Sequence, residues 1–303
     1  MLTTGEALID IVHSPGGKVA EYVGGSPANV AMGLARLGHP SDLATYVGTD
    51  DRGVRIAEHL AERGVSLTPG SDGADRTPTA EATVDEDGVA TYVFDLQWRV
   101  PPTDASAYGH LHTGSIACTL EPGGTEVLQL MEAIRPHGTV SYDPNARPTI
   151  MGTSQDARQR IEDCIGRSDV VKCSTEDAEW LYEGASMEEI AREWGRLGPP
   201  LIIITRGGDG AMAYLSETGE SIEVDARRVE VEDTVGAGDS FMSGLVSGLL
   251  DEGLLGSVEA RERLRTTDFE PIKRAVARAV ATASFTVVRA GAQAPTREEL
   301  TDS

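Results

Sequence analysis

The chain has little cysteine, little aromatic residue content and no long apolar run. Its three cysteines, Cys118, Cys164 and Cys173, are odd in number and show no Cys-x-x-Cys spacing, so they do not indicate a disulfide framework. With 303 residues, the chain can bury a sizeable core without cross-links. No uninterrupted apolar stretch reaches membrane-spanning length, and no basic segment followed by an apolar one opens the sequence. We therefore expect a soluble, cytoplasmic protein.

Positive charge is also scarce. Lys and Arg number 26 against 49 Asp and Glu, which gives a formal net charge of -23. Such a field repels polyanions, so we expect neither nucleic acid nor an anionic membrane as a partner. A phosphorylated ligand would need local positive potential from helix N-termini, an arginine or a divalent cation. The only lysines are Lys18, Lys172 and Lys273, which leaves few candidates for a lysine-based phosphate site.

From about Leu43 onward, short β-type runs alternate with helical patterns. The apolar periodicity predicts helices over 52–63, 124–135, 154–166 and 175–197, with strands between them. This alternation predicts a doubly wound α/β fold, in which helices cover both faces of a mostly parallel sheet. Ligands then bind beyond the carboxyl ends of the strands. We find no internal repeat or linker, and expect one domain over 1–303. Only MLTT precedes GEALID, so the first strand should be short.

Two segments, 11–23 and 77–99, depart from this pattern because apolar and polar residues alternate in them. The second contains the turn-forming stretch Asp85-Glu86-Asp87-Gly88. We expect a small antiparallel sheet separate from the main one. A sheet of this size cannot cover both of its faces alone, so it should lie over the active cleft as a lid or against a second subunit.

The stretch DTVGAGDSF, from Asp233 to Phe241, precedes an apolar helical stripe. Its small residues allow a phosphate to approach the N-terminus of that helix. The Walker GK[ST] element is missing, and Phe241 stands where a dinucleotide fingerprint needs glycine. Asp239 fits two roles: a helix cap, or a base that accepts a proton from a hydroxyl nucleophile. On these residues alone, a phosphate loop and a tight turn both stay open.

Other motifs are equally ambiguous when taken singly. Asp10 suits either a turn or a carboxylate that accepts hydrogen bonds from sugar hydroxyls. Asn29 is a helix-start residue whose amide can also bind hydroxyls. TRGGDG, from Thr205 to Gly210, is a common turn between strands. The spacing of His110 and His112 permits metal binding, but no third ligand lies nearby in the sequence.

Two long motifs together resemble one family. DTVGAGDSF resembles the C-terminal signature of the ribokinase-type (PfkB) carbohydrate kinases, and GGSPANVAMGLARLG, from Gly24 to Gly38, resembles their N-terminal signature. They stand in the correct order about two hundred residues apart, and GEALID, SYDPNARP and TRGGDGA extend the resemblance along the chain. Fructokinases are the most similar members. The resemblance implies a ribokinase-like fold and ATP-dependent phosphorylation of a primary hydroxyl of a small sugar, with fructose 6-phosphate as the expected product.

The resemblance also implies roles for individual residues. Asp239 would be the general base, and Gly236, Ala237 and Gly238 would form an anion hole for the transferred phosphoryl group, with Mg²⁺ bridging the phosphates of ATP. The residues expected to bind the sugar are Asp10, Gly24, Gly25, Asn29 and Arg147. The residues expected to bind ATP are Lys172, Ser174, Thr205, Gly207, Gly210, Thr234, Gly236 and Gly238.

The residues at the metal sites implied by the resemblance depart in part from the family's pattern. The family's Asn-x-x-Glu element orders metal-bound water, but Ser174 and Asp177 stand at its positions here. Asp177 is the candidate for that role. Asp233, with Thr234, is the candidate for a monovalent cation such as K⁺. We also expect a homodimer formed through the lid, because the outer face of the lid sheet must be covered.

Three alternatives remain at this point. Relatives that phosphorylate 2-keto-3-deoxygluconate, ribose or nucleosides share the scaffold, and one hydroxyl in the pocket decides among them. A catalytically silent sugar sensor would be expected to lack Asp239 or the glycines of the loop, yet all are present. A nicotinamide dehydrogenase would require an early Gly-x-Gly-x-x-Gly, which the chain lacks.

Overall fold

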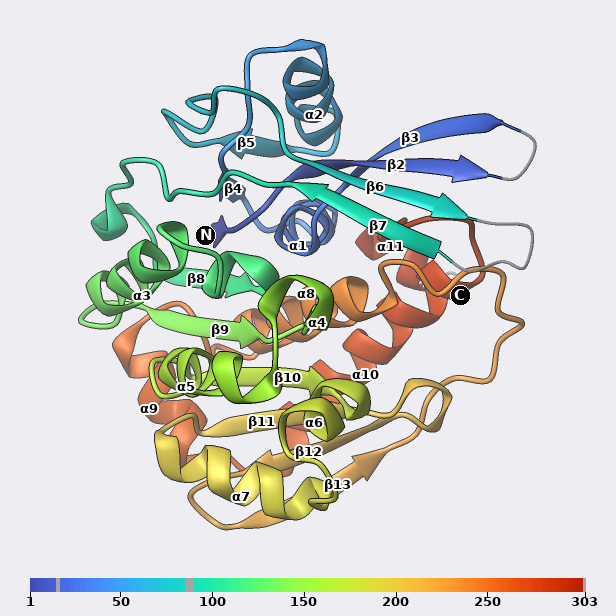
Figure 1. The fold of residues 1–303 in the computed structure, drawn as a ribbon. Helices are drawn as coiled ribbons and strands as arrows, with labels where there is room; N and C mark the ends of the chain where they lie inside the picture. Colours follow the sequence, from blue (N-terminus) through green and yellow to red (C-terminus); the bar gives the residue numbers. More distant parts are fainter. Residues whose placement is uncertain (15–16, 85–89, 302–303) are drawn as a thin grey trace.

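The computed structural model describes residues 1–14, 17–84 and 90–301. A nine-stranded sheet runs through the molecule in the order β13-β12-β11-β10-β9-β8-β1-β4-β5 (Figure 1). Strands β1, β4, β5, β8, β9, β10 and β11 are parallel, whereas β12 and β13 join antiparallel at one edge. The strand bounds are β1 Leu2–Thr4, β4 Ser41–Ala44, β5 Val65–Leu67, β8 His110–Gly114, β9 Thr139–Asp143, β10 Val170–Ser174, β11 Leu201–Thr205, β12 Ala211–Leu215 and β13 Glu220–Val224.

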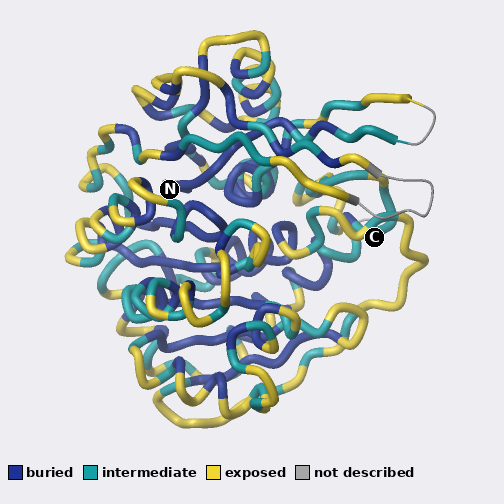
Figure 2. The backbone as a smooth tube through the Cα atoms, in the orientation of Figure 1, coloured by how far each residue is buried: buried dark blue, intermediate teal, exposed yellow. Residues whose placement is uncertain are grey.

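Helices cover both faces of this sheet, as its apolar strands require. In β11, Leu201 and Ile203 belong to the core cluster on one face, while Ile202 and Ile204 belong to the cluster on the other. Figure 2 shows the central strands buried over most of their length. The first face is covered by α1 Ser26–Arg36, α8 Ala237–Asp251, α9 Val258–Thr266 and α10 Phe269–Val287, and the second by α3 Gly123–Ile134, α5 Ser154–Ile165, α6 Thr175–Leu181 and α7 Met187–Leu197. The expected fold class is confirmed.

The helix predicted over 175–197 is instead two helices, α6 and α7. The chain leaves α6 at Tyr182 and passes through Gly184, whose φ is 76°. Ser186 then caps α7 in a reciprocal capping box with Glu189. The apolar periodicity continues across the break, so the sequence pattern did not indicate where α6 ends and α7 begins.

A second sheet of four strands has the order β3-β2-β6-β7 and lies beside the main sheet (Figure 1). Its strands are β2 Leu8–Ser14, β3 Lys18–Gly24, β6 Thr79–Val84 and β7 Ala90–Asp95. The prediction of a separate small sheet is confirmed, but β2 and β6 pair in parallel, so the sheet is mixed rather than antiparallel. The turn predicted at 85–88 lies outside the described residues.

The two faces of this small sheet differ. Ile9 and Ile11 point to one side and are buried in a core cluster with α1 and with α2 Asp51–Ala61. Asp10, which alternates with them, faces the other side, where it is in register with Tyr22 of β3. Tyr22 is 59% exposed and Tyr92 of β7 is 53% exposed, so this side carries uncovered aromatic surface.

Small residues bring α8 close to its neighbours. A Cβ on Gly248 would lie 2.6 Å from the Cα of Ala275 in α10, and one on Gly244 would lie 2.8 Å from the Cα of Ala279. On the opposite helix, a Cβ on Gly33 of α1 would meet the hydroxyl of Ser243 at 2.4 Å. This close packing fixes the N-terminus of α8 between α1 and α10. Among the described residues, two short helices, α4 Pro148–Met151 and α11 Arg297–Thr301, and three 3₁₀ turns complete the fold. The 3₁₀ turns are η1 Ala105–Ala107, η2 Ser115–Cys118 and η3 Gly207–Asp209. No helix among the described residues combines the length and the apolar character needed to cross a membrane.

Candidate active site

The candidate site lies at the carboxyl ends of the parallel strands, where open α/β sheets bind ligands. Asp143 ends β9, Ser174 ends β10 and Thr205 ends β11, and Ser174 and Thr205 are in direct register. From β1 the chain goes to β4 on one side, and from β5 it returns to β8 on the other. The strand order therefore reverses between β1 and β8, and open α/β sheets bind their ligands at such a switch point.

Asp239, the predicted base, is held by two donors from α1. Its Oδ1 accepts a hydrogen bond of 2.6 Å from the Ser26 hydroxyl, and its Oδ2 accepts one of 2.8 Å from the Asn29 amide. The residue is 8% exposed. Asn29, which we expected to bind the sugar, thus contacts the predicted base, and its part in sugar binding stays a prediction. Ser26 was not among the predicted site residues, although it stands inside the GGSPAN motif.

The loop before α8 has the geometry of an anion site. Gly236 is the N-cap residue with φ of 74°, and a Cβ there would lie 2.4 Å from that of Ala292, so glycine is required. The amide of Ala237 donates to the Thr234 carbonyl at 3.2 Å. Within the described residues, the amides of Gly236 and Gly238 have no hydrogen-bond acceptor. These two N–H groups, at the positive end of the helix dipole, are available to an anion.

A buried ion pair lies next to this loop. The Lys172 ammonium donates to Asp143 Oδ2 at 2.8 Å, and both side chains are almost fully buried. A Cβ on Gly238 would lie 3.2 Å from Lys172 Nζ, so the cation is adjacent to the loop. Burial lowers the pKa of Lys172, but the charges of Asp143, Asp177 and Asp239 outweigh it and raise that pKa above its usual range. Lys172 therefore supplies a permanent positive charge beside the anion site.

The predicted metal residues already have protein partners. Asp177 accepts hydrogen bonds from the Ala146 amide at 2.7 Å and, with its other oxygen, from the amide and hydroxyl of Ser174 at 2.9 and 2.8 Å. Asp233 accepts from the amides of Val235 at 3.0 Å and Gly291 at 2.8 Å. No cluster of three or more His, Cys, Asp or Glu suited to a metal occurs in the part of the chain that the structure describes.

The sugar-binding candidates meet where the small sheet joins α1. A Cβ on Gly24 would lie 2.0 Å from Asp10 Oδ2, so the absence of a side chain at Gly24 makes room for that carboxylate. Gly25 has φ of 110° and is pressed against the Glu6 carbonyl. Burial raises the pKa of Asp10 to about 6, although the positive charge of Arg147 opposes the shift. Arg147 is exposed, and its guanidinium donates to Asn145 Oδ1 at 2.7 Å.

The TRGGDG turn lies at the same edge, between β11 and β12. Thr205 donates its hydroxyl hydrogen bond to the Cys173 carbonyl at 3.2 Å. Gly207 and Gly210 both have positive φ, and a Cβ on Gly210 would lie 2.0 Å from the Val224 carbonyl oxygen. The backbone needs these glycines for its own conformation. Their part in binding ATP stays a prediction.

The two histidines of HLHTGS form a buried hydrogen-bond network. His110 contacts the hydroxyls of Thr139 and Ser141 at 2.8 and 3.0 Å, and His112 contacts that of Ser141 at 3.0 Å. Burial, with the charge of Lys172, lowers the pKa of His112 to about 3. Both side chains act as neutral links between β8 and β9.

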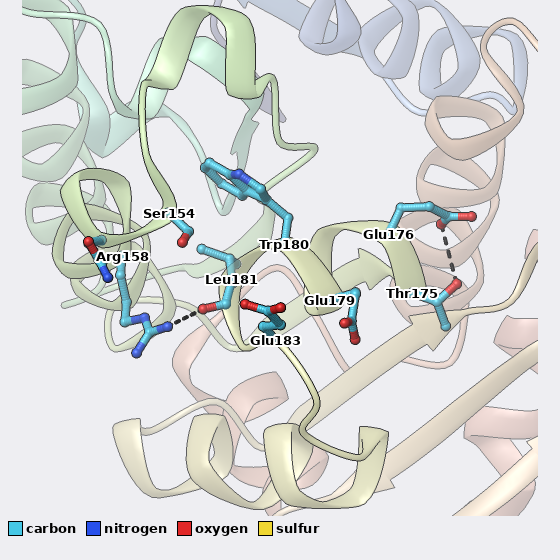
Figure 3. A pocket seen from close by; sticks show the side chains of 9 residues that line it. Ser154, Arg158, Thr175, Glu176, Glu179, Trp180, Leu181 and Glu183 are labelled. Carbon is cyan, nitrogen blue, oxygen red and sulfur yellow. Dashed lines mark hydrogen bonds between the residues drawn. The ribbon is translucent and has the colours of Figure 1, made fainter.

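A surface hollow of about 850 Å³ lies elsewhere, between α5 and α6 (Figure 3). Its lining includes Trp180 and three glutamates, Glu176, Glu179 and Glu183. Arg158 also lines it, but its guanidinium is engaged with the Leu181 carbonyl. None of the predicted site residues lines this hollow. Its negative charge opposes an anionic ligand, so the loop before α8 remains the candidate phosphate site.

Comparison with known proteins gives the family. Residues 3–299 match the model of the pfkB family carbohydrate kinases. The chain belongs to that family. This kinase is 34% identical over 268 residues to a fructokinase of Klebsiella pneumoniae, covering 84% of this chain and 86% of the relative. It is accordingly a phosphotransferase that acts on an alcohol group of a sugar.

Solved structures extend the similarity to the whole kinase. A fructokinase of Xylella fastidiosa with bound ATP shares 24% identity and the same fold, with a TM-score of 0.85 over 100% of this chain and 97% of the other. A fructokinase double mutant of Vibrio cholerae O395, bound to fructose, ADP and a potassium ion, shares 25% identity with a TM-score of 0.79 over 99% of this kinase and 97% of the other. The recognition of a ribokinase-type carbohydrate kinase is confirmed.

Proposed function

We propose that this kinase transfers the γ-phosphoryl group of ATP to the primary hydroxyl of fructose and so forms fructose 6-phosphate. The observation that carries the proposal is the position of Asp239 at the start of α8, the helix that also offers free amides to a phosphate. Its carboxylate oxygens are 2.6 and 2.8 Å from the Ser26 hydroxyl and the Asn29 amide of α1. The curated and structural relatives named fructokinase support fructose as the acceptor.

In this mechanism, Asp239 accepts the proton of the attacking hydroxyl. The hydrogen bonds from Ser26 and Asn29 fix its orientation, so that no side-chain rotation precedes the transfer. As negative charge develops on the transferred group, the Gly236 and Gly238 amides and the nearby Lys172 ammonium stabilise it. Mg²⁺ bound to ATP would neutralise phosphate charge. The expected nucleotide residues Ser174, Thr205, Gly207, Gly210 and Thr234 lie along the same strand edge or in the loop before α8.

The residues present fit metal ions only indirectly. Both oxygens of Asp177 accept hydrogen bonds from the protein, one of them from the Ala146 amide. We therefore propose that Asp177 is not a direct metal ligand and that it acts on metal-bound water by holding the segment around Ala146 in place. Asp233 connects the loop before α8 to the segment around Gly291. We propose this junction as the K⁺ site, where a cation would draw the two segments together.

At the sugar end, Asp10 and Arg147 would contact fructose, with Gly24 and Gly25 allowing its close approach. We propose that the small sheet closes over the sugar as a lid and excludes water from the transfer. The aromatic surface on the Asp10 side, with Tyr22 and Tyr92 more than half exposed, supports a homodimer in which this sheet meets that of a second copy. The kinase would then be one functional domain over residues 1–303, working in the cytoplasm.

The test is an assay of ATP consumption by the purified protein with fructose, ribose, 2-keto-3-deoxygluconate, adenosine and tagatose. Fructose should give the highest kcat/KM, and the product should carry phosphate on its primary carbon by ³¹P NMR. The Asp239→Asn variant, prepared identically, shows how much ATP consumption comes from contaminating kinases. A higher kcat/KM on another acceptor would replace fructose, and no turnover on any of them would exclude the proposal.

A further inference from the structure

Glu6, between β1 and β2, carries a buried carboxyl oxygen without a partner. The residue is 7% exposed, and its Oε2 makes no hydrogen bond within the described residues. Buried polar atoms in proteins are almost always paired, so an exception of this kind calls for an explanation. A ligand that brings a donor to Oε2 would provide one.

Glu6 lies at the point where the strand order reverses. It follows β1, and Ser115 follows the neighbouring strand β8, with Thr4 and Thr113 in register at their ends. Ser115 has φ of 56°, an unfavourable conformation for a residue with a side chain. Backbone strain of this kind gathers at ligand sites, and a reversal of strand order is where an open α/β sheet binds its ligand.

The backbone of Glu6 is held on both sides. The Gly5 amide donates to the Ala44 carbonyl at 3.1 Å, and the Ala7 amide donates to the Thr45 hydroxyl at 3.0 Å. A Cβ on Gly25 would lie 2.4 Å from the Glu6 carbonyl oxygen, so the chain is closely packed there too. The carboxyl therefore cannot leave the interior through a small backbone shift.

The charged groups around Glu6 are those of the candidate active site. Burial raises the pKa of Glu6 to about 7, the Ser115 hydroxyl and the charge of Arg147 oppose this, and Asp239 adds to it. Burial raises the pKa of the Cys118 thiol in η2, and the charge of Glu6 adds to this. The carboxyl thus lies among groups from η2, from α8 and from the start of α4.

Building on the proposed function, we propose that Glu6 binds the acceptor directly, with Oε2 accepting a hydrogen bond from a sugar hydroxyl. Nothing in the Asp239 chemistry requires this carboxyl, so its role is the choice of acceptor. Glu6 and Asp10 both interact with the charge of Arg147, so two carboxyl groups would contact the same acceptor. Such a pair favours a neutral polyhydroxy sugar and repels the carboxylate of a sugar acid.

The main test is Glu6→Gln, which keeps the size of the side chain but replaces one acceptor oxygen by a donor. The KM for fructose should rise at least about tenfold, while the KM for ATP stays within about twofold of the wild type. Discrimination between fructose and 2-keto-3-deoxygluconate, as a ratio of kcat/KM values, should fall by at least about fivefold. Glu62→Gln, at a side chain that is 75% exposed, is the matched control and should change neither.

A series of deoxyfructoses identifies the hydroxyl. The analogue that lacks the hydroxyl bound by Glu6 should have a lower kcat/KM than fructose with the wild type. With Glu6→Gln, this analogue and fructose should have similar kcat/KM values, because the partner of that hydroxyl is already gone. If Glu6→Gln is insoluble, Glu6→Asp gives the same readout through a carboxylate that is too short. An unchanged KM for fructose, or equal losses for every analogue in both proteins, would overturn the inference while fructose phosphorylation by the wild type still supports the proposed function. A wild type inactive on all sugars would instead remove the proposed function.

Discussion

The two ends of the candidate site differ in how their polar groups are satisfied. At the phosphate end, Asp239 is held by two donors and Lys172 is paired with Asp143. At the sugar end, no described residue donates a hydrogen bond to the Asp10 carboxylate, and Glu6 Oε2 is buried without a partner among the described residues. The polar groups of the phosphate end are paired within the protein, whereas the two carboxyl groups of the sugar end have acceptor atoms left for a ligand.

This difference has a chemical basis. The phosphate end performs the same step whatever the acceptor, so its groups gain from being fixed before ATP arrives. The sugar end must recognise one pattern of hydroxyls, and only polar groups without a partner in the protein can form new hydrogen bonds with the correct ligand. Substitutions at the phosphate end should therefore lower kcat, and those at the sugar end should raise the KM of the sugar.

The largest expected effect is that of Asp239→Asn. The amide cannot accept the proton, so kcat should fall by about 10²- to 10⁴-fold, while the dissociation constants of fructose and ATP change little. Steady-state kinetics and isothermal titration calorimetry give the two quantities separately. A variant with wild-type kcat would show that another group is the base.

Ser26→Ala tests whether the orientation of the base matters. Loss of the 2.6 Å hydrogen bond to Asp239 should lower kcat by about 10- to 100-fold, the usual value of a bond to a charged group, with little change in the KM of fructose. Ser243→Ala is the control, because among the described residues that buried hydroxyl bonds only within α8, to the Ser240 carbonyl at 2.8 Å. If both variants behave alike, Ser26 supports the helix rather than the base.

Gly24→Ala addresses the other end of the site. The added methyl would lie 2.0 Å from Asp10 Oδ2 and displace that carboxylate, so the KM of fructose should rise by about tenfold with the KM of ATP unchanged. Gly166→Ala, at a helix end where a Cβ meets only ordinary contacts, should leave both values unchanged. A fall in kcat alone would contradict the division of the site into two ends.

The smallest effect concerns stability. The pKa of Asp10 is raised from 3.8 to about 6 in the folded chain, so its contribution to stability is full below about pH 4 and is lost as the pH rises through 6. At pH 8, Asp10→Asn should be more stable than the wild type by about 1–3 kcal/mol, while it binds fructose more weakly. Urea unfolding at pH 4.5 and pH 8 measures the difference, which should shrink at the lower pH. Equal stability at pH 8 would place the carboxylate in a better solvated environment.

The sequence predicted the strands and the glycine turn before α8 well because both depend on local patterns. Apolar runs such as LIIIT mark buried strands, and the glycines around Asp239 mark a close approach to a helix N-terminus. The break between α6 and α7 was missed because the apolar periodicity runs across it. The parallel pairing of β2 with β6 was missed because alternation shows that a strand is half buried but not which strand lies beside it.

The contacts within the site were harder to predict. Nothing in GGSPAN indicates that Ser26 will meet Asp239, because this depends on α1 packing against α8 at Gly33. Glu6 was overlooked for a similar reason. In GEALID it is one acidic residue among 49, and only its burial at the reversal of strand order sets it apart.

The bonds from Ser26 and Asn29 to Asp239 join residues 213 and 210 positions apart. On the ribosome, at about 5–20 residues per second, the first helix emerges tens of seconds before the segment that it must orient. Until that segment arrives, a nascent chain has neither the base nor the loop before α8. Incomplete chains therefore cannot consume ATP by this mechanism, and catalytic competence appears only when the two ends of the polypeptide come together.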